Sequence, residues 1–138
     1  MKSTNAKEPS RLEMQVLSVL WERGPATVRE VQAALPDGKI RAYTTVLTVL
    51  QVMEKKGLLT HTSQGNTHVY TPATTRRQTI GPVLINLVRQ MFGGSPATAM
   101  QHLLAEHEVS PEELARLKQL LADHEAKNAS QIAKGKKS

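Results

Sequence analysis

Apolar residues recur every three or four positions in three successive segments of the first half of the chain, which predicts three helices. Serine or threonine followed three positions later by glutamate, at residues 10–13 and 27–30, forms a capping box at the expected start of the first two helices. Glycine and proline within residues 24–25 and 36–38 are expected to end them. The third helix is expected to begin near Ala42 and to end at Gly57.

The apolar pattern then changes from helix to strand. Residues 58–63 and 67–71 are rich in β-branched side chains, and Gly65-Asn66 between them fits a two-residue hairpin turn. Pro72 is expected to end the second strand. Three helices followed by a β-hairpin is the order of a winged helix-turn-helix. Residues 10–74 are therefore expected to form such a domain, with the third helix in a DNA groove and the hairpin along the DNA backbone.

Residues 75–125 have a helical pattern throughout. Three apolar stripes predict three helices, and Gly81-Pro82 is expected to kink the first of them or to delay its start. Three helices with one apolar side each make little core alone, so they either fold back on the first domain or pair with a second chain. We favour a three-helix dimerisation domain, because a helix-turn-helix protein gains affinity and site length by doubling.

The residues expected at the dimer interface are Val83, Leu84, Leu87, Val88, Met91, Leu114, Leu117 and Leu121. The alternative is that some of them fill the protomer's own core. The expected fold is thus mainly α with a small β-hairpin, an N-terminal winged helix-turn-helix followed by a helical dimerisation domain. Residues 1–9 are expected to be frayed, and residues 126–138 to be a basic disordered tail.

The third predicted helix has two chemically different faces. Ala42, Val46, Val49, Leu50 and Met53 share one face at helical pitch, and the other face carries hydroxyl, amide and lysine side chains without an acid between residues 44 and 51. Threonine and glutamine suit base edges and thymine methyl groups, whereas lysine suits phosphates. The residues expected to face DNA bases are Tyr43, Thr44, Thr45, Leu47, Thr48 and Gln51. The alternative is an ordinary core helix, with Tyr43 or Thr45 partly buried against the first helix.

The formal net charge of +6 is unevenly distributed along the chain. Residues 1–75 carry +3, residues 76–126 carry −1 and residues 127–138 carry +4. The first half therefore attracts polyanions, and the middle does not. For the tail, a solubilising role is favoured over nonspecific attraction to DNA. The cations expected to contact phosphates are Arg11, Lys39, Arg41, Lys55, Lys56, Arg76 and Arg77. The alternative for each of them is a solvated surface charge.

Composition excludes several classes of chemistry. The absence of cysteine excludes disulfides, zinc–thiolate sites and thiol catalysis. No glycine-rich phosphate loop, nucleophile elbow or catalytic acid pair is present, so we expect no catalytic residue, no cofactor and no enzyme. The histidine pairs 61/68 and 102/107 lack a carboxylate at obvious ligand spacing, so no metal site is expected. No stretch is apolar enough to span a bilayer and no signal peptide is apparent, which predicts a cytoplasmic protein without membrane insertion.

The chain resembles the penicillinase-repressor family of bacterial transcriptional regulators, the BlaI/MecI/CopY group, from about Leu12 to Asp123. The residues that carry the resemblance are LEMQVL with LW at 12–21, GPATVREV at 24–31, AYTTV at 42–46, residues 50–59, GGSP at 93–96 and the leucine-rich segment 110–121. The resemblance implies a homodimeric winged-helix repressor of short inverted repeats in double-stranded DNA. In better-known members, a membrane sensor protease causes cleavage of the dimerisation half.

This chain departs from the family pattern at four places. It lacks the cysteines of the copper-responsive branch, and His102-Leu103 stands where well-known members have Asn-Phe at the cleavage site. The expected hairpin tip carries no lysine or arginine, and Leu47 replaces an arginine on the third helix, so fewer guanine contacts are expected. The competing hypothesis is a winged-helix protein–protein module that binds no specific DNA sequence.

Overall fold

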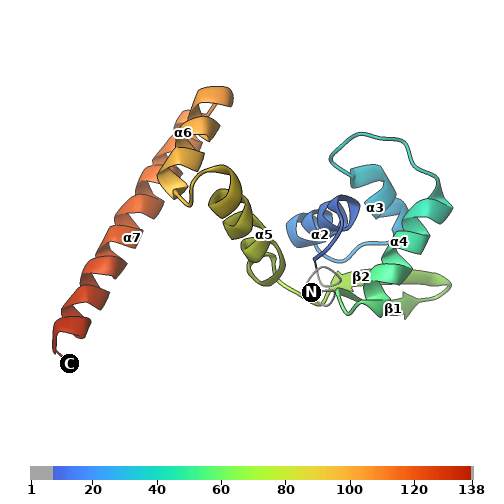
Figure 1. Cartoon of the computed structure of the whole chain (residues 1–138). Coiled ribbons are helices and arrows are strands. Elements are labelled where there is room, and N and C mark those ends of the chain that lie inside the picture. The colour runs from blue at the N-terminus through green and yellow to red at the C-terminus, as the bar shows by residue number, and fades with distance from the viewer. Residues whose placement is uncertain (1–7, 138) are drawn as a thin grey trace. The chain divides into compact units, whose positions relative to one another are not determined.

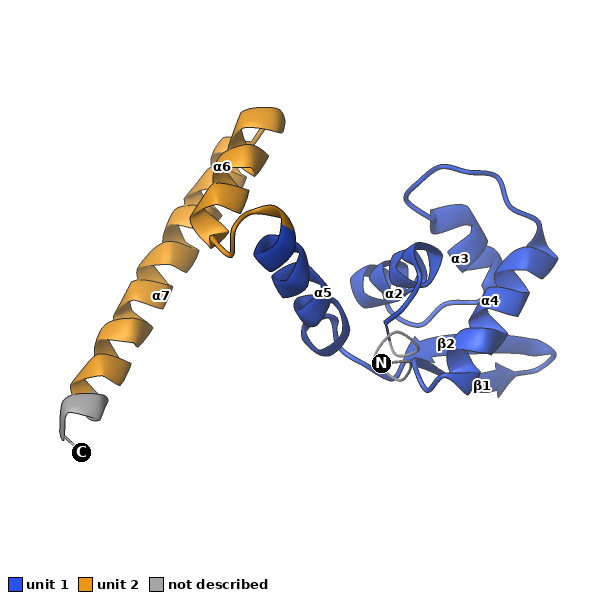
Figure 2. Ribbon diagram, in the orientation of Figure 1, with its two compact units in different colours: residues 1–90 blue, residues 91–138 orange. Residues whose placement is uncertain are grey.

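The structure is a computed structural model that describes residues 8–137, with side chains described for residues 8–133. The chain divides into two compact units, residues 1–90 and 91–138 (Figure 2). The first contains α2 (Arg11–Arg23), α3 (Val28–Ala34), α4 (Tyr43–Lys55), β1 (Leu59–Gln64), β2 (Thr67–Pro72) and nearly all of α5 (Arg76–Met91), as Figure 1 shows. The second contains α6 (Pro96–Glu106) and α7 (Pro111–Lys137). This order of three helices, hairpin and further helices confirms the predicted winged-helix fold class.

Both predicted capping boxes are present. The Ser10 backbone N–H donates to Glu13 Oε1 at 2.9 Å, and the Glu13 N–H donates to Ser10 Oγ at 3.1 Å. The corresponding bonds between Thr27 and Glu30 are 2.9 and 3.2 Å. These bonds satisfy N–H groups that the first turn of a helix leaves without a partner. In contrast, α4 begins at Tyr43, and its N-cap residue, Ala42, makes no side-chain capping bond.

The core of the first unit lies among α2, α3, α4 and the hairpin. Its buried hydrophobic residues are Val16, Leu17, Val19, Leu20, Ala26, Val28, Val31, Leu35, Val46, Leu50, Met53, Leu59 and Tyr70. Tyr70 and Ala26 also exchange two backbone hydrogen bonds of 2.8 and 3.0 Å, which join the loop before α3 to the outer side of β2. This pairing fixes the hairpin against the helices.

The hairpin has the predicted two-residue turn. Leu59 pairs with Pro72 at one end and Gln64 with Thr67 at the other, leaving Gly65 and Asn66 as the two-residue turn. Gly65 has φ of +63°, and no residue other than glycine has positive φ among the described residues. Glycine with positive φ at the first central position is the arrangement of a type II′ turn, whose twist suits paired strands.

The predicted domain boundary at residues 74–75 differs from the observed division after residue 90. The Trp21 indole Nε1–H donates to the Thr74 carbonyl at 2.9 Å, and the Arg76 guanidinium pairs with Glu22 at 2.8 Å. These contacts tie the start of α5 to α2. Of the two alternatives for Gly81-Pro82, the delayed start does not occur, because α5 begins at Arg76 and includes Pro82.

The prediction of a disordered tail is corrected by α7, which continues to Lys137. The apolar period fades after Leu121, but alanine, glutamine and lysine are good helix formers and no proline interrupts them. At the other end, the predicted fraying of residues 1–7 lies outside the described residues, whereas Pro9 is buried. Within the described residues, none of the helices has the length and hydropathy needed to cross a membrane.

Candidate nucleic-acid interface

Helix α4 separates its apolar and polar side chains as predicted. Val46, Leu50 and Met53 are buried in the core. The threonines at 44, 45 and 48 and Gln51 are exposed on the remaining surface, which we call the α4 outer face. Leu47 is half-buried and packs against the core, and Ala42 is exposed as the cap residue instead of inward-facing. The outer face therefore offers short polar side chains to a partner.

Thr48 has a more restricted hydrogen-bonding capacity than its sequence suggests. Its hydroxyl donates to the Thr44 carbonyl at 2.8 Å, one turn back along α4. The hydroxyl proton is therefore used within the helix. In this rotamer Thr48 can offer a base only oxygen lone pairs and its methyl group, and the methyl group suits a thymine.

Tyr43 lies at the first turn of α4 and is exposed, so the alternative of burial against α2 does not describe this side chain. The Arg29 guanidinium on α3 lies over its ring, 5.0 Å from the centroid. Arg29 was absent from the predicted phosphate contacts. The signal for it was available, since residue 29 lies within the capping box of residues 27–30, two positions before the inward Val31.

A groove with a cavity volume of about 350 Å³ runs between the start of α3, α4 and the hairpin tip. Arg29 lines it from α3, Tyr43 and Gln51 line it from α4, and Asn66 and His68 line it from the hairpin. Its lining contains no acidic side chain. The groove therefore combines residues from three elements that a linear reading of the sequence does not bring together.

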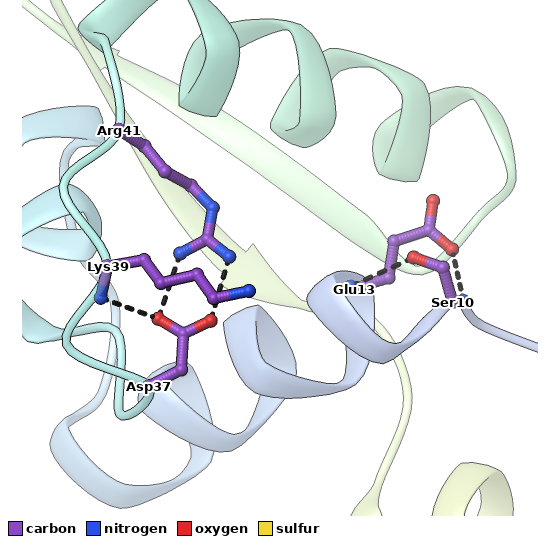
Figure 3. Close-up of polar contacts among 5 residues, drawn as sticks. All are labelled: Ser10, Glu13, Asp37, Lys39 and Arg41. Atoms are coloured by element: carbon purple, nitrogen blue, oxygen red, sulfur yellow. Dashed lines mark hydrogen bonds and ion pairs between the residues drawn. The ribbon is translucent and has the colours of Figure 1, made fainter.

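One of the predicted phosphate contacts, Arg41, is engaged near the start of α4. Arg41 makes a bidentate pair with Asp37, with Nη1–Oδ1 and Nη2–Oδ2 distances of 3.0 and 2.7 Å (Figure 3). The Lys39 backbone N–H also donates to Asp37 Oδ1 at 3.0 Å, while the Lys39 side chain is exposed. These donors, Arg41 first, hold the pKa of the Asp37 carboxyl well below its usual range. Arg41 thus orders the loop before α4.

Lys56 is also engaged inside the protein. Its Nζ lies 2.9 and 3.0 Å from the carboxylate oxygens of Glu13, which is only 5% exposed. Glu13 therefore caps α2 and neutralises Lys56 at the end of α4. Arg76 is likewise paired with Glu22, and its guanidinium lies 5.3 Å from the centre of the Trp21 ring. These arrangements give Lys56 and Arg76 structural contacts in the free protein.

The remaining predicted cations are exposed. Arg11, Lys39, Lys55 and Arg77 take part in no side-chain ion pair within residues 8–133. Their charges are therefore available to a polyanion at little cost in internal contacts.

His61 and His68 share one face of the hairpin, with stacked rings whose centroids are 4.3 Å apart. His61 Nδ1 also lies 2.8 Å from both carboxylate oxygens of Glu54 on α4, a partner that the sequence reasoning missed. The short turn after α4 folds β1 back along the helix and brings these residues together. No group of three or more potential ligands suited to a metal ion occurs in the described part of the chain.

The predicted interface residues of the later helices lie largely on open surface. Leu84, Leu87, Met91, Leu114 and Leu121 are exposed, and Val83, Val88 and Leu117 are half-buried. His102 and Leu103 are both exposed on α6, and the His102 ring lies 5.4 Å from that of Phe92. Helices α5 and α6 contain no buried residue.

The capped helices, the α4 outer face and the hairpin define the chain as a winged helix-turn-helix protein. Its sequence matches the family described as penicillinase repressor over residues 9–123. The chain belongs to this family, whose proteins are DNA-binding transcriptional regulators and not enzymes. The resemblance noted from the sequence is confirmed.

Two curated relatives illustrate this similarity. The transcriptional regulator BlaI of Mycobacterium tuberculosis is 35% identical over 117 residues, which cover 83% of each chain. The penicillinase repressor of Bacillus licheniformis is 27% identical over 115 residues, covering 83% of this chain and 90% of that protein. The solution structure of the Bacillus licheniformis BlaI monomeric form with the blaP half-operator is 30% identical, with a TM-score of 0.44 over 51% of this chain and 85% of that one.

Proposed function

We propose that this chain is a cytoplasmic homodimeric repressor that binds an inverted-repeat operator through α4. The α4 outer face carries the proposal, because Thr44, Thr45, Thr48 and Gln51 are exposed there without an acidic neighbour between them. Side chains of this kind suit adenine edges and thymine methyl groups in a major groove. The family match and the half-operator complex of a relative support the same assignment.

A gel shift on the DNA upstream of the chain's own gene tests the contact at α4. Thr48→Glu places a carboxylate on the α4 outer face, so we expect it to abolish the shift by repulsion from the DNA phosphates. Thr60→Glu is the matched control, because Thr60 is exposed on β1 at the end of the hairpin opposite the tip. Equal binding by Thr48→Glu and the parent contradicts the assignment. If the parent protein binds no DNA but binds a protein partner, the result supports the alternative of a winged-helix protein–protein module.

Phosphate contacts are proposed for the exposed cations Arg11, Lys39, Lys55 and Arg77. Each neutralised phosphate contributes about −0.9 to the slope of log K against log salt concentration. If a dimer neutralises roughly six phosphates, the slope is near −5. A slope near zero contradicts a nucleic-acid function for this surface.

Dimerisation is proposed to use α5, α6 and α7. Among the described residues, all the exposed large apolar side chains except Ile40, Tyr43 and Val52 belong to these helices. An apolar surface of this kind on a water-soluble regulator is typical of a subunit interface. Obligate interfaces often bury more than about 2,000 Å² in total, which two sets of three helices can supply.

Sedimentation tests the dimer. Leu87 is 48% exposed on α5, and Leu87→Asp is expected to sediment as a monomer because it places a charge within the interface. Asn86→Asp adds the same charge at the neighbouring exposed polar position and serves as the control. An unchanged dimer in Leu87→Asp removes α5 from the interface.

Release of the operator is proposed to follow cleavage near His102 and Leu103, through a membrane sensor protease. Both residues are exposed, but they lie within α6, so cleavage requires local unwinding because proteases bind extended backbone. Intact-mass measurement on protein from derepressed cells tests this step. A full-length chain under derepression contradicts it and points to release without proteolysis.

A further inference from the structure

The groove between α3, α4 and the hairpin has the chemistry of an anion site. Its polar lining includes Thr27, Arg29, Tyr43, Gln51, Asn66 and His68, and none of its lining side chains is acidic. Hydroxyl, amide, imidazole and guanidinium groups all donate hydrogen bonds. The groove also shares Gln51 with the α4 outer face, so the two surfaces are continuous.

Arg29 is the one arginine that lines this groove. Within residues 8–133 it belongs to no ion pair, whereas Arg41 and Arg76 are held by carboxylates. Its guanidinium instead lies over the Tyr43 ring. Stacking on an aromatic face orients a guanidinium and leaves its N–H groups free for an acceptor.

We propose that the groove binds one phosphodiester of the operator backbone, with Arg29 as its ligand and Tyr43 as the residue that positions Arg29. The inference rests on the proposed function and deepens it. The two non-bridging oxygens of a phosphodiester accept the two parallel N–H groups of a guanidinium in a bidentate manner. A backbone phosphate, and not a free anion, is the fitting occupant because the groove opens beside residues proposed to read bases. The contact fixes the register of α4 on the duplex without reading sequence itself.

Binding of operator DNA by the full chain tests the ligand role. Arg29→Ala is expected to weaken binding about tenfold for each bound protomer and to reduce the magnitude of the salt slope by about 0.9 per protomer. The loss is expected on operator and unrelated DNA alike, because a phosphate contact carries no sequence information. Arg116→Ala is the control for net charge, since Arg116 is exposed on α7. Equal losses in both variants overturn the proposal.

Tyr43 variants test the positioning role. Tyr43→Phe keeps the ring and is expected to retain the salt slope, whereas Tyr43→Ala is expected to lower affinity in the parent but much less in the Arg29→Ala background. This non-additivity is the signature of two residues that act as a unit. Additive losses contradict positioning and assign Tyr43 an independent contact.

Neutral methylphosphonate linkages, introduced one at a time along the operator, test the partner. One linkage per half-site is expected to weaken the parent about tenfold and to leave Arg29→Ala unchanged. If parental binding persists and every linkage affects both proteins equally, the groove is not a phosphate site and the repressor function stands. If the parent binds no DNA, the proposed function itself fails. If the chain binds inorganic phosphate as tightly as it binds duplex DNA, the ligand of the groove is a free anion and the assignment to a DNA phosphate is wrong.

Discussion

Lys55 and Lys56 are adjacent at the end of α4, yet the structure gives them different environments. Lys56 reaches the buried carboxylate of Glu13, which is 43 positions away in the sequence. Lys55 is exposed and has no ion pair among the described residues. Short-range patterns predicted the capping boxes because both partners lie within three residues. The Glu13–Lys56 pair depends on how α2 and α4 pack, which no local pattern specifies.

Single substitutions of these lysines are expected to separate stability from binding. Lys56→Ala leaves a buried carboxylate without its cation and is expected to lower the free energy of unfolding by about 1–3 kcal/mol. Lys55→Ala is expected to change it by less than about 0.5 kcal/mol while reducing the salt slope of DNA binding. Urea denaturation and salt-dependent gel shifts measure the two effects. Equal stability of the two variants contradicts a structural role for Lys56.

Asp37 is expected to make stability depend on pH at the acid end. Its carboxyl has a lowered pKa in the folded chain because Arg41 and the Lys39 N–H stabilise the charged form. The contribution of Asp37 to the free energy of unfolding is therefore fully present above the pKa of about 3.9 that the group has in the unfolded chain. This contribution is lost as the pH falls through the pKa of the folded chain. Urea denaturation of the parent and Asp37→Asn gives their free energies of unfolding. The difference between these free energies is expected to be constant from about pH 7 to 5 and to shrink below about pH 4. A difference independent of pH rules out this linkage.

At the scale of the elements, starts and ends were predictable where the chain signals them chemically. Caps, glycines and the two-residue turn set α2, α3 and the hairpin, and the structure has each of them. The extension of α7 was missed because it depends on helix propensity after the apolar period ends. The groove was missed because α3, α4 and the hairpin tip each contribute only a few of its residues.

The hairpin turn gives a test at this scale. Gly65 has positive φ, where a Cβ is strained although nothing lies within 4 Å of it. Gly65→Ala is expected to lower the free energy of unfolding by about 1 kcal/mol. Asn66→Ala, at a position without positive φ, is expected to change it by less than about 0.5 kcal/mol. Thermal or urea denaturation measures the change in the free energy of unfolding for both variants. Equal changes contradict the assignment of Gly65 to the turn position that requires positive φ.

At the scale of the whole molecule, the segment from α2 to β2 and the later helices differ in how completely they bury apolar side chains. The buried hydrophobic residues all lie between Val16 and Tyr70, whereas α5 to α7 expose leucine, isoleucine and methionine. The sequence predicted the apolar faces of these helices, but the sequence of one chain does not show which partner surface packs against them. The attachment of the start of α5 to α2 was not predictable from local patterns either, since Trp21 contacts Thr74 and Glu22 contacts Arg76 across more than 50 positions of sequence.

Thermal unfolding is expected to depend on protein concentration if the later helices pair between two copies. Association stabilises the folded form by mass action, so the apparent Tm of the parent is expected to rise as the chain concentration increases. Leu87→Asp is expected to unfold at a Tm independent of concentration. Differential scanning measurements over a dilution series make the comparison. A parental Tm that stays constant on dilution contradicts an obligate dimer.

The position of Trp21 has a practical consequence for following this molecule in solution. The chain contains a single tryptophan, and its indole is bonded to Thr74 and covered by Arg76. Intrinsic emission excited at the red edge therefore has one source, located where the winged helix joins α5. Any rearrangement passed along α5 must alter the polarity or quenching around that indole, so the unlabelled protein carries its own optical probe of the junction.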